Sequence, residues 1–286
     1  MEYPAAWPLS LTGCAHYLRE PGTDNSINFA FKKGLVGRPW LEVMRYRPED
    51  SFQTPETVGF FYPRRMSYMH SFSLTENYAV FLFYPVKIDP KVTCTKPIPG
   101  VLSTQHTLLQ KFSESNFHVF EVFDGGNKTE ATDVYVVGLK DGQVHGPYEA
   151  PYAYSGHHIN AYEKSEKKIV VDFCPTPWEN FREYLKLENM LNPPETIDWD
   201  HDISTTNGEE ATRFTVDMRK GNVIKTIFPN TINSKFINTF DFPTINERYR
   251  GKKYCITYGV TAIAYSRVAL VKKNICDSDQ DKVTVK

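Results

Sequence analysis

The segment Met69-His70-Ser71-Phe72-Ser73-Leu74-Thr75-Glu76-Asn77-Tyr78 places a histidine at the start of a run of small polar and apolar residues. Two other segments centred on histidine lie far from it in the chain, Cys14-Ala15-His16 and Gly156-His157-His158-Ile159-Asn160-Ala161-Tyr162-Glu163. Neutral imidazole is the commonest protein ligand of metals, and it suits iron, copper, nickel and zinc. Histidines so far apart in sequence can converge only on a large rigid scaffold. The sequence therefore predicts a metal centre that is built by the fold and not by a local loop.

Strand-like segments dominate the chain around these histidines. They are rich in β-branched and aromatic residues, and turn residues such as Asp141-Gly142 separate them. The expected strands cover residues 117–123, 133–139, 168–173, 212–218, 222–228 and 253–264. Residues 212–228 predict a hairpin that turns at Arg219-Lys220-Gly221. Many short strands at this spacing indicate an all-β sandwich, barrel or propeller.

A few segments depart from the strand pattern. Trp178 to Leu191 has helical periodicity and is ended by Asn192-Pro193-Pro194, which predicts a helix. Residues 195–210 are acidic and polar, so we expect an exposed loop, and the charged tail 277–286 is expected to fray. No repeat or linker divides the sequence, which predicts a single domain over residues 1–286.

The composition excludes some classes of protein. A chain of 286 residues with 41% hydrophobic content can fill a large core, and a net charge of -1 gives no reason to expect a nucleic acid partner. The longest apolar run, Tyr78 to Val86, is far shorter than the ~20 residues that span a bilayer. The first residues do not follow the pattern of a secretory signal. The five cysteines form no CxxC pair, which fits reduced thiols in a cytoplasmic protein.

The histidine motifs together resemble those of the carotenoid cleavage oxygenase family, which includes beta-carotene oxygenases and the retinoid isomerohydrolase. Residues 70–78 are similar to the family's His-Ser/Asp-Phe-x-x-Thr-Glu-Asn-Tyr motif, and residues 157–163 are similar to its His-x-x-Asn-Ala-Tyr-Glu motif. Phe240-Asp241-Phe242-Pro243-Thr244-Ile245-Asn246 looks like its Phe-Glu-Phe-Pro-x-Ile-Asn motif, and Thr12-Gly13-Cys14-Ala15-His16 is similar to its Thr-Ala-His segment. The resemblance implies a seven-bladed β-propeller over nearly the whole chain. Relative to the family the chain is expected to be truncated at both ends, so the propeller is expected to be incomplete.

The resemblance also implies a cofactor, Fe(II), that four histidines bind on the propeller axis. Three of these positions match His16, His70 and His157. Neighbouring side chains of a strand point to opposite faces, so only one of His157 and His158 can ligate, and the motif selects His157. The family's fourth histidine lies in a Phe-His-Gly-like segment near its C-terminus, whereas here only His158 and His201 follow His157, and neither has that context.

A carboxylate is implied beside one of these histidines. By resemblance Asp241 orients an imidazole through the ring's other N–H group. The family usually has Glu there, and Asp is one methylene shorter. The hydrogen bond could therefore be lengthened or lost, or the backbone could shift to keep it. For Glu76 and Glu163, which lie inside the motifs, structural hydrogen bonds are at least as plausible as direct chemistry.

The implied activity is cleavage of a conjugated double bond of a carotenoid or apocarotenoid by dioxygen into two carbonyl products. Aromatic residues could line an apolar tunnel for such a substrate, although ordinary packing is the more common role; candidates are Phe60, Phe61, Tyr62 and Phe72. Retinoid isomerohydrolase activity and a non-catalytic relative that binds an apolar polyene or a partner protein are the alternatives. An unrelated zinc hydrolase needs only three protein ligands and water. The expected location is the cytoplasm, and peripheral association with a membrane is left open.

Overall fold

The computed structural model describes residues 9–14, 16–33, 38–50, 54–88, 123–125, 128–176, 178, 211–228, 240–264, 267–277 and 282–285. Nearly all of the secondary structure in these residues is β-strand, apart from two 3-10 turns at Pro48–Asp50 and Glu247–Tyr249. This confirms the expected all-β class. None of the helices in these ranges is long and apolar enough to cross a membrane.

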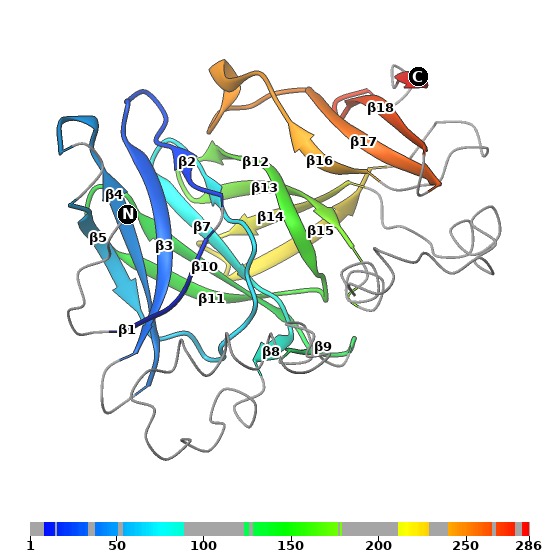
Figure 1. Cartoon of the computed structure of the whole chain (residues 1–286). Coiled ribbons are helices and arrows are strands. Elements are labelled where there is room, and N and C mark those ends of the chain that lie inside the picture. Colours follow the sequence, from blue (N-terminus) through cyan, green and yellow to red (C-terminus); the bar gives the residue numbers. More distant parts are fainter. Residues whose placement is uncertain are drawn as a thin grey trace, which may run out of the picture.

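The strands of the described residues form four large sheets and one two-stranded sheet (Figure 1). The first sheet contains β1 (Leu9–Gly13), β2 (Leu18–Arg19), β3 (Ser26–Lys33), β4 (Trp40–Tyr46) and β5 (Glu56–Phe61). The second contains β6 (Ser73–Leu74), β7 (Tyr78–Phe83), β10 (Thr132–Gly138) and β11 (Val144–Ala150). The third contains β12 (Ser155–Ser165), β13 (Lys168–Pro175), β14 (Thr212–Asp217) and β15 (Asn222–Ile227). The fourth contains β16 (Asp241–Thr244), β17 (Ile256–Ala264), β18 (Arg267–Asn274) and β19 (Lys282–Val285), and the small sheet pairs β8 (Val86–Ile88) with β9 (Phe123–Gly125).

Each of the second, third and fourth sheets runs in chain order from one edge to the other with antiparallel pairing. Their first strands meet, because β12 contacts β6 on one side and β16 on the other. Consecutive antiparallel sheets that share a line of first strands are the arrangement of blades in a β-propeller. Every predicted site residue lies in or next to the first strand of its sheet.

The long apolar run at Tyr78 to Val86 is explained by burial on both faces of β7. Alternate side chains of a strand point to opposite faces. Ala79, Phe81 and Phe83 enter the core between the first and second sheets. Val80 and Leu82 enter the core between the second and third sheets. A strand between two blades therefore needs apolar residues at every position, whereas a strand with one solvent face needs them at every second one.

The first strand of the third sheet also ties its neighbours together through polar side chains. Glu163 accepts hydrogen bonds from the Thr75 hydroxyl at 2.8 Å and from the Asn77 backbone N–H at 3.0 Å. Asn160 donates to the carbonyl oxygens of Tyr249 and Lys252, both at 3.1 Å. These bonds join β12 to the turn after β6 and to the loop after β16. For Glu163, the structure supports the expected structural hydrogen bonds.

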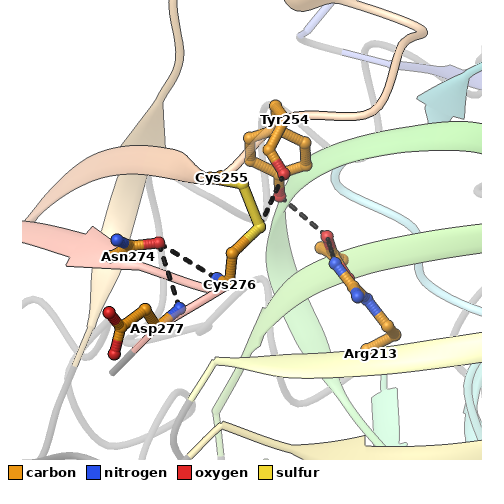
Figure 2. Close-up of a disulfide and its surroundings, with 7 residues drawn as sticks. Arg213, Tyr254, Cys255, Asn274, Cys276 and Asp277 are labelled. Carbon is orange, nitrogen blue, oxygen red and sulfur yellow. Dashed lines mark hydrogen bonds and ion pairs between the residues drawn. A yellow bond between two sulfur atoms is a disulfide. The ribbon is translucent and has the colours of Figure 1, made fainter. Parts of the chain in front are cut away.

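The cysteines differ from the sequence expectation. Cys255 and Cys276 form a disulfide (Figure 2), so the expectation of reduced thiols is wrong for this pair, while Cys14 and Cys174 are free and buried. The bond joins the residue before β17 to a residue just after β18. Next to it, the Tyr254 hydroxyl donates to Asp172 at 2.8 Å, and the buried Asp172 is paired with Arg213 at 2.7 Å. This network holds the fourth sheet against the third.

Other expectations have mixed outcomes. The hairpin at 212–228 is confirmed as β14 and β15, with Gly221 at a positive φ of 71° in the turn. The frayed tail is wrong for residues 282–285, because they form β19 and pair with β18, where Val283 and Val285 suit a strand. The helix predicted at 178–191, apart from Trp178, the loop at 195–210 and most of the strand at 117–123 lie outside the described residues.

Replacing Glu163 with Ala tests the tie between the second and third sheets. The change leaves the Thr75 hydroxyl and the Asn77 amide groups without their acceptor, so Glu163→Ala is expected to lower the free energy of unfolding by about 1–3 kcal/mol. Exposed Glu166 lies in the turn between β12 and β13, and Glu166→Ala should change the free energy by no more than about 0.5 kcal/mol. Urea unfolding of the three proteins measures both values. Equal stability of the two variants would contradict the structural role of Glu163.

Candidate metal centre

The structure brings His16, His70 and His157 together at the first strands of three sheets. His16 lies between β1 and β2, His70 precedes β6, and His157 lies in β12. Each offers one ring nitrogen, and these three atoms lie within 4.8 Å of one another. The Nε2 atoms of His16 and His70 are 2.8 Å apart. Three segments that are remote in sequence thus point imidazoles at one small volume.

A buried serine fixes the position of His70 relative to His157. The Ser71 hydroxyl donates to the Gly156 carbonyl oxygen at 2.8 Å and accepts the His158 backbone N–H at 3.0 Å. Gly156 and His158 flank His157 on β12. The serine of the His70-Ser71 pair therefore attaches the segment that carries one imidazole to the strand that carries another.

Cys14 fixes the position of His16 in a similar way. Its sulfur lies 3.2 Å from the His70 carbonyl oxygen and accepts the His16 backbone N–H at 3.3 Å. Burial raises the pKa of the Cys14 thiol to about 12, so the sulfur stays protonated. The sulfur is thus held by backbone groups of the two histidine segments, and among the described residues the ligand atoms that converge belong to His16, His70 and His157, so Cys14 serves as a link between the two segments.

Asp241, expected beside one of the histidines, lies beside His157. Its Oδ1 atom is 2.8 Å from His157 Nδ1, so the shorter Asp side chain keeps this bond. The same oxygen accepts the backbone N–H of Phe242 at 2.8 Å, and Phe242 adopts a left-handed backbone with φ of 49°. Since Nδ1 of His157 faces the carboxylate, its Nε2 is the nitrogen that faces the shared centre.

The protonation of His16 and His70 suits metal binding. Burial, with a further contribution from His157 and His16, lowers the pKa of His70 to about 4. Burial also lowers the pKa of His16, and the neighbouring His157 adds to this effect. Imidazole must be neutral to ligate a metal, and both rings are neutral at pH 7.

His158 points away from this centre into the protein. Its Nδ1 lies 2.8 Å from the Ser73 hydroxyl, and its Nε2 lies 2.9 Å from the Tyr84 hydroxyl. Both ring nitrogens are therefore occupied by structural partners, as expected for a residue on the opposite face of the strand from His157. Burial lowers the pKa of His158 to about 3.

Two residues near the centre were not expected from the sequence. The Tyr68 hydroxyl lies 3.2 Å from His70 Nδ1, and burial raises its pKa, so it stays protonated at neutral pH. The Phe242 ring lies 4.9 Å from the His157 ring and is 66% exposed. The available signals were the placement of Tyr68 two residues before a histidine and of Phe242 directly after the expected carboxylate.

The aromatic residues considered for a substrate tunnel have different environments. Phe61 and Phe72 are buried in the core between the first two sheets, which agrees with the packing role. Phe60 and Tyr62 are exposed. His145 packs against Tyr78 away from the centre, and His106, His118 and His201 lie outside the described residues.

The lowered pKa of the half-buried His158 predicts a measurable loss of stability in acid. Its pKa in the folded protein lies below its ordinary value of 6.5, so the unfolded chain takes up this proton first as the pH falls. This contribution to stability is complete above about pH 6.5 and is lost progressively towards pH 3. Urea unfolding at about pH 7 and about pH 5 should therefore show a smaller pH-dependent loss for His158→Gln than for the wild type.

The control for this experiment is His145→Gln, which changes a half-buried histidine on β11. It should keep the wild-type dependence on pH. The explanation would be wrong if His158→Gln lost as much stability between the two pH values as the wild type does.

Comparison with known proteins places the chain in a family. The sequence profile described as retinal pigment epithelial membrane protein (RPE65) matches residues 3–284. The carotenoid 9,10(9',10')-cleavage dioxygenase 1 of Phaseolus vulgaris is 25% identical over 205 residues, which cover 72% of this chain and 30% of that protein. The mitochondrial carotenoid-cleaving dioxygenase of Macaca fascicularis is 26% identical over 132 residues, which cover 46% of this chain and 21% of that protein.

Solved structures agree on the fold. Cobalt-substituted Synechocystis ACO superposes with a TM-score of 0.62 at 16% identity, over 96% of this chain and 50% of that one. The lignostilbene dioxygenase of Pseudomonas brassicacearum gives a TM-score of 0.61 at 19% identity, over 96% of this chain and 52% of that one. The chain thus spans about half the length of these structures. The expected propeller of the carotenoid oxygenase type is confirmed, and the chain belongs to the RPE65 and carotenoid oxygenase family.

Proposed function

We propose that this chain provides part of an Fe(II)-dependent dioxygenase that cleaves a conjugated double bond of a carotenoid or apocarotenoid to carbonyl products. The observation that carries the proposal is the convergence of His16, His70 and His157, whose ligand nitrogens lie within 4.8 Å of one another. The names of the bean and macaque relatives, both of which refer to carotenoid cleavage, support the substrate class. They favour cleavage over retinoid isomerohydrolase activity and over a non-catalytic role. Nothing in these comparisons supports a zinc hydrolase.

The residues of the centre fit a divalent iron ion. Neutral imidazoles are suitable ligands for Fe(II), and the Nε2 atoms of the three histidines would hold it. Iron bound there would supply the activation of dioxygen. Asp241 would accept the Nδ1 hydrogen of His157 and so hold that ring in its ligating orientation. The exposed Phe242 ring beside His157 offers an apolar surface on which a polyene could lie.

Peripheral contact with a membrane is a further part of the proposal. Trp40, Phe60 and Tyr62 form an aromatic cluster on β4, β5 and the residue after β5, with ring centroids 6.2 and 6.4 Å apart. Phe60 is 55% exposed and Tyr62 is 53% exposed. The amphipathic rings of Trp40 and Tyr62 favour the membrane–water interface, the exposed Phe60 ring adds apolar surface, and an apolar polyene dissolves in bilayers. The cytoplasmic location stays a prediction.

Metal content tests the centre directly. His70→Ala and His157→Ala each remove one of three ligands, so we expect the near-stoichiometric iron of the anaerobically Fe(II)-loaded chain to fall to background in both variants. His145→Ala, which lies away from the centre, should keep the wild-type iron content. Iron content is measured by plasma emission after gel filtration. Unchanged iron in either ligand variant would rule out the assigned centre.

The activity follows from the same preparation. Iron-loaded protein incubated with an apocarotenoid under labelled dioxygen should yield two carbonyl products by liquid chromatography and mass spectrometry, with label from dioxygen. Absence of products from a preparation that retains iron would contradict the proposed cleavage reaction for this chain.

The aromatic cluster gives a separate prediction. Phe60→Ser with Tyr62→Ser should reduce co-sedimentation with phosphatidylcholine vesicles by several-fold, because one interfacial anchor, Tyr62, and the apolar ring of Phe60 are lost. Ile224 and Ile227 are comparably exposed on β15, and changing both to Ser is the matched control. Equal vesicle binding by the two double variants would refute a specific role for the cluster.

A further inference from the structure

The Nδ1 atoms of the three histidines have different surroundings. His157 Nδ1 faces the Asp241 carboxylate at 2.8 Å. His70 Nδ1 faces the Tyr68 hydroxyl at 3.2 Å. Within the described residues, no hydrogen bond to His16 Nδ1 is found. A carboxylate, Asp241, thus lies beside Nδ1 of His157, whereas a neutral phenol, Tyr68, lies beside Nδ1 of His70.

We propose that Tyr68 is a positioning residue for His70, whose Nδ1 hydrogen its hydroxyl oxygen accepts so that Nε2 faces the shared centre. The inference rests on the proposed function, because it concerns a histidine in its metal-binding orientation. A histidine that ligates through Nε2 carries its hydrogen on Nδ1, and that hydrogen needs an acceptor. The oxygen of a phenol can accept as well as donate, so Tyr68 meets this need.

The surroundings of Tyr68 hold its hydroxyl in place. Its ring packs against the core between the second and third sheets, and its backbone N–H donates to the Val86 carbonyl oxygen at 3.2 Å. The preceding residue, Ser67, is buried and donates to the Tyr84 carbonyl oxygen at 2.6 Å. The segment that leads to His70 is therefore anchored to β8 and to the end of β7. A fixed hydroxyl restricts the His70 ring more than a mobile water molecule would.

The chemical character of the two partners predicts a graded effect. A hydrogen bond to a carboxylate is roughly twice as strong as one between neutral groups. Loss of the group that hydrogen-bonds to the other ring nitrogen of a ligating histidine typically costs about 10- to 100-fold in metal affinity, and we expect a loss of this size for Asp241. For the neutral Tyr68 hydroxyl we expect a smaller loss, about 2- to 10-fold.

The test compares Co(II) binding by the full chain carrying Tyr68→Phe or Tyr84→Phe. Each change removes one hydroxyl that lies beside a histidine nitrogen, but the partner of Tyr84 is His158, which does not face the centre. Titration followed by visible absorption should give a dissociation constant for Co(II) about 2- to 10-fold higher in Tyr68→Phe and unchanged in Tyr84→Phe. Circular dichroism checks that both variants are folded.

A second readout separates orientation from general stability. In the Co(II)-loaded protein, proton NMR resolves the Nδ1 hydrogens of ligating histidines, and their exchange with solvent can be timed. The His70 hydrogen should exchange slowly in the wild type and faster in Tyr68→Phe, while the His157 hydrogen is unchanged. If Tyr68→Phe does not fold, the wild type alone decides, because a His70 hydrogen that exchanges as fast as that of His16 would overturn the inference.

The outcomes distinguish this inference from the proposed function. If the wild-type chain takes up no Co(II), both the proposed metal centre and this inference are contradicted. Normal Co(II) binding by the wild type, with affinity and exchange unchanged in Tyr68→Phe, would overturn only the role of Tyr68. A higher dissociation constant together with faster His70 exchange supports it.

Discussion

The geometry of the centre depends on the Ser71 hydroxyl, which bonds at once to the Gly156 carbonyl oxygen and to the His158 backbone N–H. These two groups lie on either side of His157, so the bond sets the distance between the segments that carry His70 and His157. A buried hydroxyl that has both a donor and an acceptor partner would lose a hydrogen bond in another arrangement, and this loss would cost free energy. Cys14 makes the corresponding link between the segments of His16 and His70. The segments that carry the imidazoles are therefore joined through backbone groups that lie beside these rings.

The spacing of residues within the segment 157–163 is explained by separate tasks along one strand. His157 faces the shared centre, Asn160 holds the loop after β16, and Glu163 holds the turn after β6. His158 faces the opposite side and fills a polar position in the core. One strand therefore orients a ligand and fixes both neighbouring sheets. The chemistry of the centre and the assembly of the blades are specified by the same few residues.

Much of this could be predicted from the sequence, for reasons that differ from element to element. Strands such as β13 and β14 were predictable because their β-branched and aromatic residues lie between clear turn signals. The convergence of His16, His70 and His157 came from a family resemblance, since no local spacing joins them. The Cys255–Cys276 pair could not be foreseen, because it depends on which strand ends meet in the fourth sheet. The strand at 282–285 was missed because it forms only against β18, and Tyr68 was missed because its contact depends on a side-chain rotamer.

The burial of β7 on both faces has a consequence for the chain before it folds. Residues 79–84 are uncharged, apolar and rich in strand-forming side chains, and none of them has a solvent face in the native protein. A segment of this kind is the sequence type that stacks into intermolecular β-sheets when it is exposed. Pro85 follows it directly, and Glu76 and Lys87 flank it with charge. Such flanking residues act as gatekeepers against aggregation, so the border of β7 protects the nascent chain while its interior builds two cores.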